Sequence, residues 1–217
     1  MRTFGFPEFL FILEAAKWTV LLSIIAFAGG SIGGLVIALC RTCEVKVLRF
    51  AATVFTQIFQ GTPLLLQLFL IFFGAPVLGI EVNPWIAASV ALILNSAAFL
   101  GEIWRGCIEA VPRGQWEAAQ ALSLNYTHRM RDEVLPQAFK VAEAPTVGYL
   151  VQIIKGTSLA AIIGFVEVTR AGQIINNATF QPLIVFSAVA AIYFVLCWPL
   201  SLWAGRIERR QALAQAR

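Results

Sequence analysis

The chain has 217 residues, of which 59% are hydrophobic and 13% are charged, and its net charge at pH 7 is +4. Soluble domains carry about 25% charged residues, so this much apolar side chain exceeds what one soluble core can bury. The composition all but excludes an ordinary soluble domain and indicates an integral membrane protein.

Five segments are long and apolar enough for a membrane-spanning helix, which needs roughly twenty residues. They are residues 18–40, 50–73, 84–108, 138–154 and 183–204. Before them, Met1 and Arg2 with residues 4–13 predict an amphipathic lead-in, because Glu8 and Glu14 interrupt the apolar run and no cleavage site follows. Residues 158–166 are apolar but short, which favours a re-entrant or packed half-helix over a sixth span.

The first span contains the run Gly29-Gly30-Ser31-Ile32-Gly33-Gly34. Small residues at this spacing let membrane helices approach closely, so the run predicts helix packing. A phosphate-binding loop is the alternative, but no Gly-Lys-Ser/Thr follows, and no Walker A pattern occurs in the chain. The sequence therefore predicts no ATP hydrolysis by this route.

The second span contains Gly61 and Pro63, and the proline predicts a kink because it removes a backbone hydrogen bond. Four polar residues surround this kink, namely Gln57, Gln60, Thr62 and Gln67. They indicate either a helix that lines a polar path or a plain packing distortion. Both interpretations stay open on the sequence.

Ionisable residues at the depth or edge of the membrane are Glu102 and Lys155, with Glu143 nearer the basic side. Charges are costly in lipid and usually face a bundle interior or an aqueous cavity. Each of the first two could contact a zwitterionic substrate or brace a helix. No Ser-His-Asp set and no carboxylate pair in a common apolar pocket occurs, so an enzyme is not expected.

The Cys40-Arg41-Thr42-Cys43 motif is predicted to be structural. A zinc site needs about four ligands, yet His128 is the single histidine, and Cys107 and Cys197 lie in apolar segments without ligand spacing. A redox motif would sit at a helix start, whereas this one closes a predicted membrane helix. No metal site is expected.

Basic residues gather in alternate connections, which predicts the topology. They follow the first, third and fifth spans: Arg41, Lys46 and Arg49; Arg113, Arg129, Arg131 and Lys140; and Arg206, Arg209, Arg210 and Arg217. Residues 74–83 contain none, and the segment after the fourth span contains only Arg170. The N-terminus is therefore predicted outside and the C-terminus in the cytoplasm. The excess of basic residues is explained by the membrane topology, so no nucleic-acid partner is expected.

A polar stretch at residues 114–136 separates the third and fourth spans and is predicted to form two short helices with a turn near residues 123–125. Glu117 is predicted in the first turn of the first helix, where an acidic side chain suits the helix dipole. Ala118 and Ala119 would let this helix enter a groove, and Arg129 and Arg131 would pair across an interface. An ordinary solvated loop is the alternative.

The polar stretch resembles the EAA loop of ABC-importer permeases, because Glu117-Ala118-Ala119 and Leu135-Pro136 fall at that motif's spacing. Three further segments resemble polar amino-acid permeases of the His/Gln/Arg type: Gln60-Gly61-Thr62-Pro63-Leu64, Ala98-Phe99-Leu100-Gly101-Glu102-Ile103-Trp104-Arg105-Gly106 and Lys155-Gly156-Thr157-Ser158-Leu159. Four residues depart from the pattern: Gln60 replaces Arg, Ser123 replaces the turn Gly, Glu133 replaces an apolar residue, and Gly156 replaces Asp or Asn.

The resemblance implies an all-α, MetI-like, type I importer permease in the bacterial inner membrane, with residues 1–217 as one domain and a coupling loop at about 113–136. Its implied partners are a second permease, identical or related, two ATPase subunits, an extracytoplasmic amino-acid-binding protein and membrane lipid. The chain itself would hold no cofactor, because ATP and Mg would be used by the ATPases. An ion-coupled secondary carrier and a non-transporting membrane assembly subunit are the alternatives.

The resemblance also implies two sets of site residues. The residues implied to couple to the ATPase are Glu117, Ala118, Ala119, Ser123, Arg129, Arg131, Leu135 and Pro136. The residues implied to line the substrate path or its gate are Gln60, Thr62, Glu102, Lys155, Thr157 and Ser158.

Overall fold

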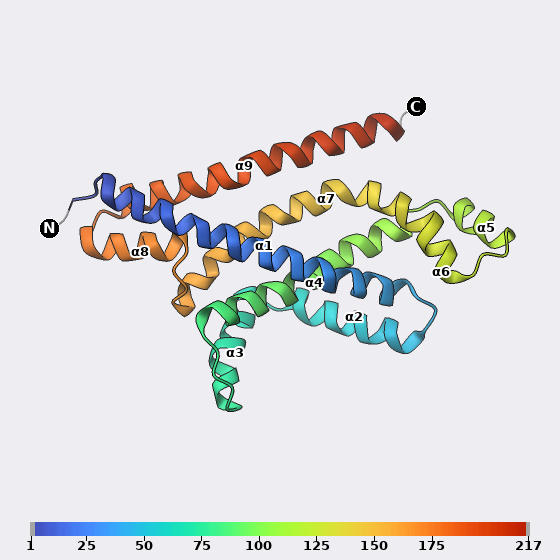
Figure 1. The fold of residues 1–217 in the computed structure, drawn as a ribbon, viewed down its shortest axis with the longest axis horizontal. Coiled ribbons are helices and arrows are strands. Elements are labelled where there is room, and N and C mark those ends of the chain that lie inside the picture. Colours follow the sequence, from blue (N-terminus) through green and yellow to red (C-terminus); the bar gives the residue numbers. More distant parts are fainter. Residues whose placement is uncertain (1–2, 216–217) are drawn as a thin grey trace.

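A computed structural model describes residues 3–215 of the chain, so Met1, Arg2 and Arg217 of the predictions above lie outside the described residues (Figure 1). The described part is helical and contains no strand. The long helices are α1 (Phe6–Thr42), α4 (Pro84–Glu109), α7 (Leu135–Gly156) and α9 (Pro182–Gln215). Shorter elements are α2 (Lys46–Gly61), α3 (Leu64–Val77), α5 (Arg113–Ala121), α6 (Tyr126–His128), η1 (Arg129–Val134), η2 (Thr157–Ile163) and α8 (Val168–Thr179). The predicted all-α membrane fold is confirmed.

Helix α1 corrects the expected division into a lead-in and a first span, because both form one helix of 37 residues. Its start is set by local chemistry: the Gly5 backbone N–H donates to the Glu8 carboxylate at 3.1 Å, and Pro7 lies in the first turn. A proline is tolerated there, since the first N–H groups of a helix have no internal acceptor. Nothing between the two predicted parts interrupts the helix.

The second predicted span is divided at Pro63, where α2 and α3 meet at 100°. Within residues 3–215, four helices are each long and apolar enough to cross a membrane, and the bent pair makes up to five spans, as the sequence predicts. The break exposes the carbonyls of Phe59 and Thr62, and the side-chain amide of Gln67 donates to both, at 2.8 and 3.0 Å. A buried amide thus replaces the hydrogen bonds that the break removes.

Helices α1 and α4 pack closely because their contact is lined by glycine. A Cβ at Gly30 would lie 2.4 Å from the Ser96 Cβ, and one at Gly34 would lie 3.0 Å from the Gly101 backbone nitrogen. No room for a side chain therefore remains at this crossing. The predicted packing role of the glycine run is confirmed, and α4 is its partner.

The apolar residues 158–166 form no sixth span. Their segment starts with the 3-10 helix η2, which packs into the core through Ala160 and Ile163. Gly164 ends it with a φ of +86°, which glycine adopts without strain. The short amphipathic helix α8 follows, and α9 then runs back along the bundle beside α7 (Figure 1). The predicted packed half-helix is confirmed.

Candidate functional site

The polar loop projects from one end of the bundle and is built from α5, a turn, α6 and η1 (Figure 1). The first predicted short helix and the turn are confirmed. The second is corrected: α6 and η1 run without a break into α7, so they extend that long helix. Ser123 has a φ of +56°, the left-handed conformation that favours glycine, and its side chain is strained there.

Helix α5 has an inner and an outer face. Ala119 is buried and Trp116 half-buried, whereas Glu117 and Ala118 are exposed. Leu122, at the end of the helix, is 72% exposed. This exposed apolar side chain in the polar loop is a feature that the sequence pattern did not single out.

The predicted place of Glu117 within α5 is wrong. The helix begins at Arg113, directly after Pro112, so Glu117 is its fifth residue and lies in the second turn. Proline marks helix starts because its fixed φ suits the first positions. The favourable interaction with the helix N-terminus, which is confined to the first turn, therefore does not explain this carboxylate.

Arg129 is held inside the loop. Its guanidinium lies 5.6 Å from the ring centre of Trp116 and 5.8 Å from that of Tyr126, and its Nη2 atom is 3.6 Å from a Glu44 carboxylate oxygen. The cation–π contacts join α5 and α6 to η1, and the ion pair reaches the connection between α1 and α2. Arg131 is exposed and lies 3.9 Å from Asp132.

At the junction with the long helix, Leu135 is half-buried and Pro136 exposed within the first turn of α7. Glu133 is half-buried in η1, and its carbonyl accepts from Gln137 at 3.0 Å. Pro136 has no backbone N–H to donate, and the π-helical turn η1 lies directly before it, so the continuous helix passes this point without one of its hydrogen bonds.

Glu102 joins α1 to α4 near the end of the bundle that carries the polar loop. Arg41 donates to its carboxylate, and the Nε atom of Arg105 lies 3.1 Å from both of its oxygens. Arg105 also pairs with Glu109. The two charges that face Glu102 come from α1 and from its own helix, which supports the bracing interpretation over a free substrate contact.

The six predicted path residues do not gather at one place. Gln60 and Glu102 line a common cavity of about 570 Å³ between α2, α4 and α7. Thr62 is exposed and donates to the Ile58 carbonyl at 2.8 Å. The other three, Lys155, Thr157 and Ser158, lie where α7 ends and η2 begins.

The hydroxyls of Thr157 and Ser158 donate to the carbonyls of Ile154 and Lys155, each at 2.7 Å, and thereby satisfy the end of α7. Lys155 is exposed and forms no ion pair within residues 3–215. A Cβ on Gly156 would lie 3.3 Å from Leu64, so this glycine allows α3 to approach the end of α7.

A polar network inside the bundle was predicted only in part, since Gln67 was named at the kink but its partners Asn95 and Tyr149 were not. The Asn95 amide donates to Gln67 at 3.2 Å, and the Tyr149 hydroxyl donates to Asn95 at 3.3 Å. Together they tie α3, α4 and α7 at the break in the second span. A lone asparagine within the apolar run 84–108 was the signal that could have located it, because a buried amide needs partners.

All four cysteines are free thiols, and the Cys43 thiol donates to the Cys40 carbonyl at 3.1 Å. No group of three or more His, Cys, Asp or Glu side chains within residues 3–215 could hold a metal ion.

Comparisons with known proteins agree on one class. A family model described as "Binding-protein-dependent transport system inner membrane component" matches residues 30–213. The arginine transport system permease protein ArtQ of Bacillus subtilis is 37% identical over 205 residues, which cover 94% of each chain. The L-cystine transport system permease protein TcyB of the same species is 38% identical over 194 residues, covering 89% of this chain and 83% of TcyB. A crystal structure of an amino acid ABC transporter with histidines matches with a TM-score of 0.88 and 31% identity, covering 96% of this chain and all of its own.

Proposed function

Because the chain belongs to the family of binding-protein-dependent transport system inner membrane components, we propose that its loop 113–136 is the docking site of an ATPase subunit. The chain is a multi-pass permease subunit of an amino-acid ABC importer of the bacterial type. The observation that supports this proposal most directly is that Glu117 and Ala118 on α5 and the apolar Leu122 at its C-terminal cap are all exposed. An exposed apolar anchor rimmed by charge is the usual composition of a docking surface.

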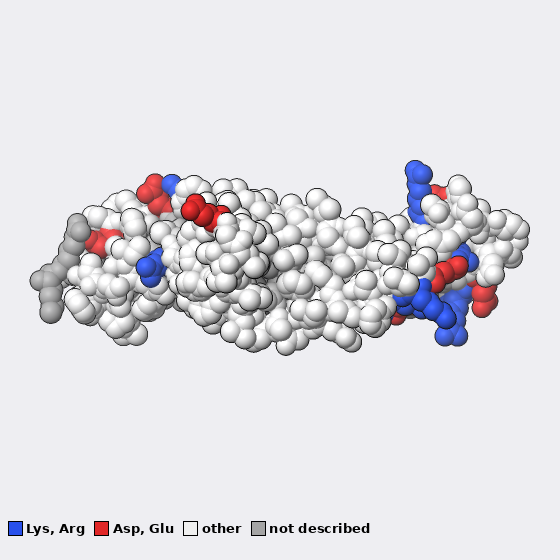
Figure 2. Space-filling view, turned by 90° about the horizontal axis from the view of Figure 1, so that it is seen from below, with Lys and Arg blue, Asp and Glu red and all other residues white. Residues whose placement is uncertain are grey.

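The proposed assembly contains a second permease, identical or related, two separate ATPase subunits and an extracytoplasmic amino-acid-binding protein. ATP and Mg are used by the ATPases, and this chain contributes half of the translocation path. Figure 2 shows Lys and Arg gathered at the end that carries α5 and α6, and a largely uncharged middle. That distribution supports a cytoplasmic position for the loop and for the C-terminus.

The loop is built to pass movement to the membrane helices. Trp116 on α5 contacts the guanidinium of Arg129, and η1, which carries Arg129, continues into α7. The amide of Gln137 on α7 also reaches Gln115 at 3.4 Å. A force on α5 therefore reaches α7, one wall of the cavity that Gln60 and Glu102 line. Closure of the ATPase dimer would thereby alter access to the path.

Reconstitution tests this function directly. The chain is placed in liposomes with candidate permease and ATPase partners and the binding protein, and amino-acid uptake and ATP hydrolysis are measured together. Uptake is expected only when the ATPases and ATP are present. Uptake driven by an ion gradient with the ATPases absent would establish a secondary carrier and refute the proposal.

A Glu117→Lys change is expected to weaken ATPase binding at least tenfold, which corresponds to about 1.4 kcal/mol. The reversed charge would either repel a basic partner in the docking groove or stay there without a partner. Affinity is measured with the purified permease and ATPase in detergent. Glu81→Lys is the matched control, since Glu81 is exposed in the connection between α3 and α4, away from the loop. Equal affinities for both variants would count against docking through α5.

A further inference from the structure

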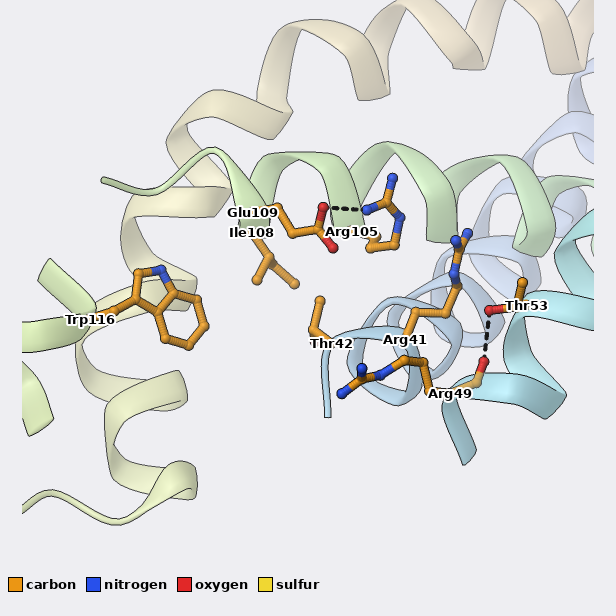
Figure 3. A pocket seen from close by; sticks show the side chains of 8 residues that line it. All are labelled: Arg41, Thr42, Arg49, Thr53, Arg105, Ile108, Glu109 and Trp116. Atoms are coloured by element: carbon orange, nitrogen blue, oxygen red, sulfur yellow. Dashed lines mark hydrogen bonds and ion pairs between the residues drawn. The ribbon is translucent and has the colours of Figure 1, made fainter. Parts of the chain in front are cut away.

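Three arginine side chains from separate helices line one cavity beside the loop (Figure 3). Arg41 comes from the last turn of α1, Arg49 from the first turn of α2 and Arg105 from the end of α4. The cavity holds about 340 Å³, and Trp116 of α5 closes one side of it. A space of this size is within the range of ligand pockets.

The acidic residues at this cavity do not balance its basic ones. Glu102 pairs with Arg41 and Arg105, and Glu109 pairs with Arg105. Arg49 has no carboxylate within 4.0 Å among the described residues, and its guanidinium donates to the Cys43 carbonyl at 2.6 Å. Three guanidinium groups against two carboxylates leave one net positive charge.

The cavity is also rich in unused hydrogen-bond donors. A guanidinium has five N–H donors, and within the described residues Arg41 and Arg49 each direct only one of them to a protein acceptor. The hydroxyls of Thr42 and Thr53, which line the same cavity, donate to carbonyls of their own helices. Anion recognition here therefore falls to the guanidinium groups, whose planar donor pairs match phosphate oxygens.

The surroundings of Arg49 indicate where such a phosphate comes from. Val47 and Phe50, on the same turns of α2, are 76% and 71% exposed. Exposed apolar side chains that alternate with basic ones are typical of a segment lying at a membrane surface. A soluble phosphate compound has no use for this apolar flank, whereas the acyl chains of a lipid would cover it.

We propose that this cavity binds the phosphate of an anionic phospholipid, with Arg49 and Arg41 as its ligands and the acyl chains lying over Val47 and Phe50. A zwitterionic lipid fits less well, because its cationic headgroup would face the same arginines. The bound lipid joins α1, α2 and α4 next to Trp116. The membrane's content of anionic lipid would then set how firmly the loop is held against the bundle.

Lipid binding is tested on the full chain in phosphatidylcholine nanodiscs with and without phosphatidylglycerol. Native mass spectrometry counts the retained phosphatidylglycerol, and its titration gives the affinity. Wild-type protein is expected to retain this lipid saturably, and Arg49→Gln to weaken the binding about tenfold, because the variant removes the charge-assisted hydrogen bonds of the guanidinium to the phosphate. Arg49 is exposed, so the variant is expected to fold, which its melting temperature verifies.

Lys46→Gln is the matched control, because it removes the same charge from the same turn of α2 but does not line the cavity. It is expected to change the affinity less than twofold. Equal losses in both variants would show diffuse attraction to the surface and overturn the site. Inorganic phosphate or glycerol phosphate that displaces phosphatidylglycerol at the concentration of the lipid itself would assign the cavity to a soluble anion and overturn the lipid assignment.

Discussion

Replacing Gly30 by valine is expected to unfold most of the protein or to lower its free energy of unfolding by about 3 kcal/mol or more. A Cβ at this position would lie 2.4 Å from the Ser96 Cβ and 3.3 Å from the Ser96 backbone carbon, so α1 and α4 would have to separate. The two helices meet again at Gly34 and Gly101, where a side chain would strike backbone atoms. The strain therefore cannot relax by the movement of one flexible side chain.

The effect is measured as thermal unfolding of the purified chain in detergent, where a loss of about 3 kcal/mol corresponds to roughly 10 °C. Gly205→Val is the control, because a Cβ at Gly205 on α9 meets nothing within 4 Å. The control is expected to melt close to the wild type. A Gly30→Val protein that melts with its control would show that the α1–α4 crossing is looser than its geometry indicates.

The α1–α4 crossing shows which parts of the fold can be predicted from the sequence and which cannot. Small residues at 29–34 predict that α1 packs closely on something, because such runs have few other uses in lipid. They do not say on what, since the partner, α4, contributes Ser96 and Gly101 from far along the chain. Apolar runs likewise locate the spans well, and Pro63 predicts the break between α2 and α3. The sequence does not show that Asn95 of α4 supplies a polar partner at this break, through its contacts with Gln67 and the Phe59 carbonyl.

In the polar loop, too, local backbone features can be predicted from the sequence, whereas tertiary contacts cannot. Ser123 has the positive φ that the glycine of the family pattern requires, because that conformation is a local property of the turn. The partners of Arg129, by contrast, are set by tertiary contacts with Trp116 and Glu44, which no local pattern reveals. The cavity at Arg49 could not be predicted for a related reason. In the sequence Arg49 is one of several basic residues that indicate topology, and only the fold places it at the same cavity as Arg41 and Arg105.

Glu167 is the second position at which one substitution is expected to have a large effect. Its side chain is 0% exposed and caps α8, accepting the backbone N–H groups of Thr169 and Arg170 at 2.9 Å each and the Tyr193 hydroxyl at 2.6 Å. Glu167→Ala removes the cap and leaves buried donors without acceptors, which is expected to cost about 3 kcal/mol in total.

The carboxyl of Glu167 also predicts a pH dependence of stability. Glu167 lies between η2 and α8, outside the membrane-spanning helices. Burial raises the pKa of its carboxyl above the ordinary value of 4.5, although the hydrogen bonds from Tyr193 and the backbone act to lower it. The Arg170 guanidinium does not offset this, since it turns to Gln173 at 3.1 Å. The folded state therefore holds the proton more tightly than the unfolded state. The contribution of this protonated carboxyl to the free energy of unfolding is fully present below pH 4.5 and is lost as the pH rises through the raised pKa.

Glu167→Gln separates the two effects, because it keeps an acceptor oxygen for the donors but cannot ionise. Melting temperatures measured from acid to neutral pH are expected to fall for the wild type across this window, to fall less for Glu167→Gln, and to be lowest for Glu167→Ala at every pH. A Gln variant as unstable as the Ala variant would mean that the charge of Glu167, rather than its acceptor oxygens, holds α8 to α9. The wild type would then gain stability with rising pH, the opposite of the direction that burial of this carboxyl requires.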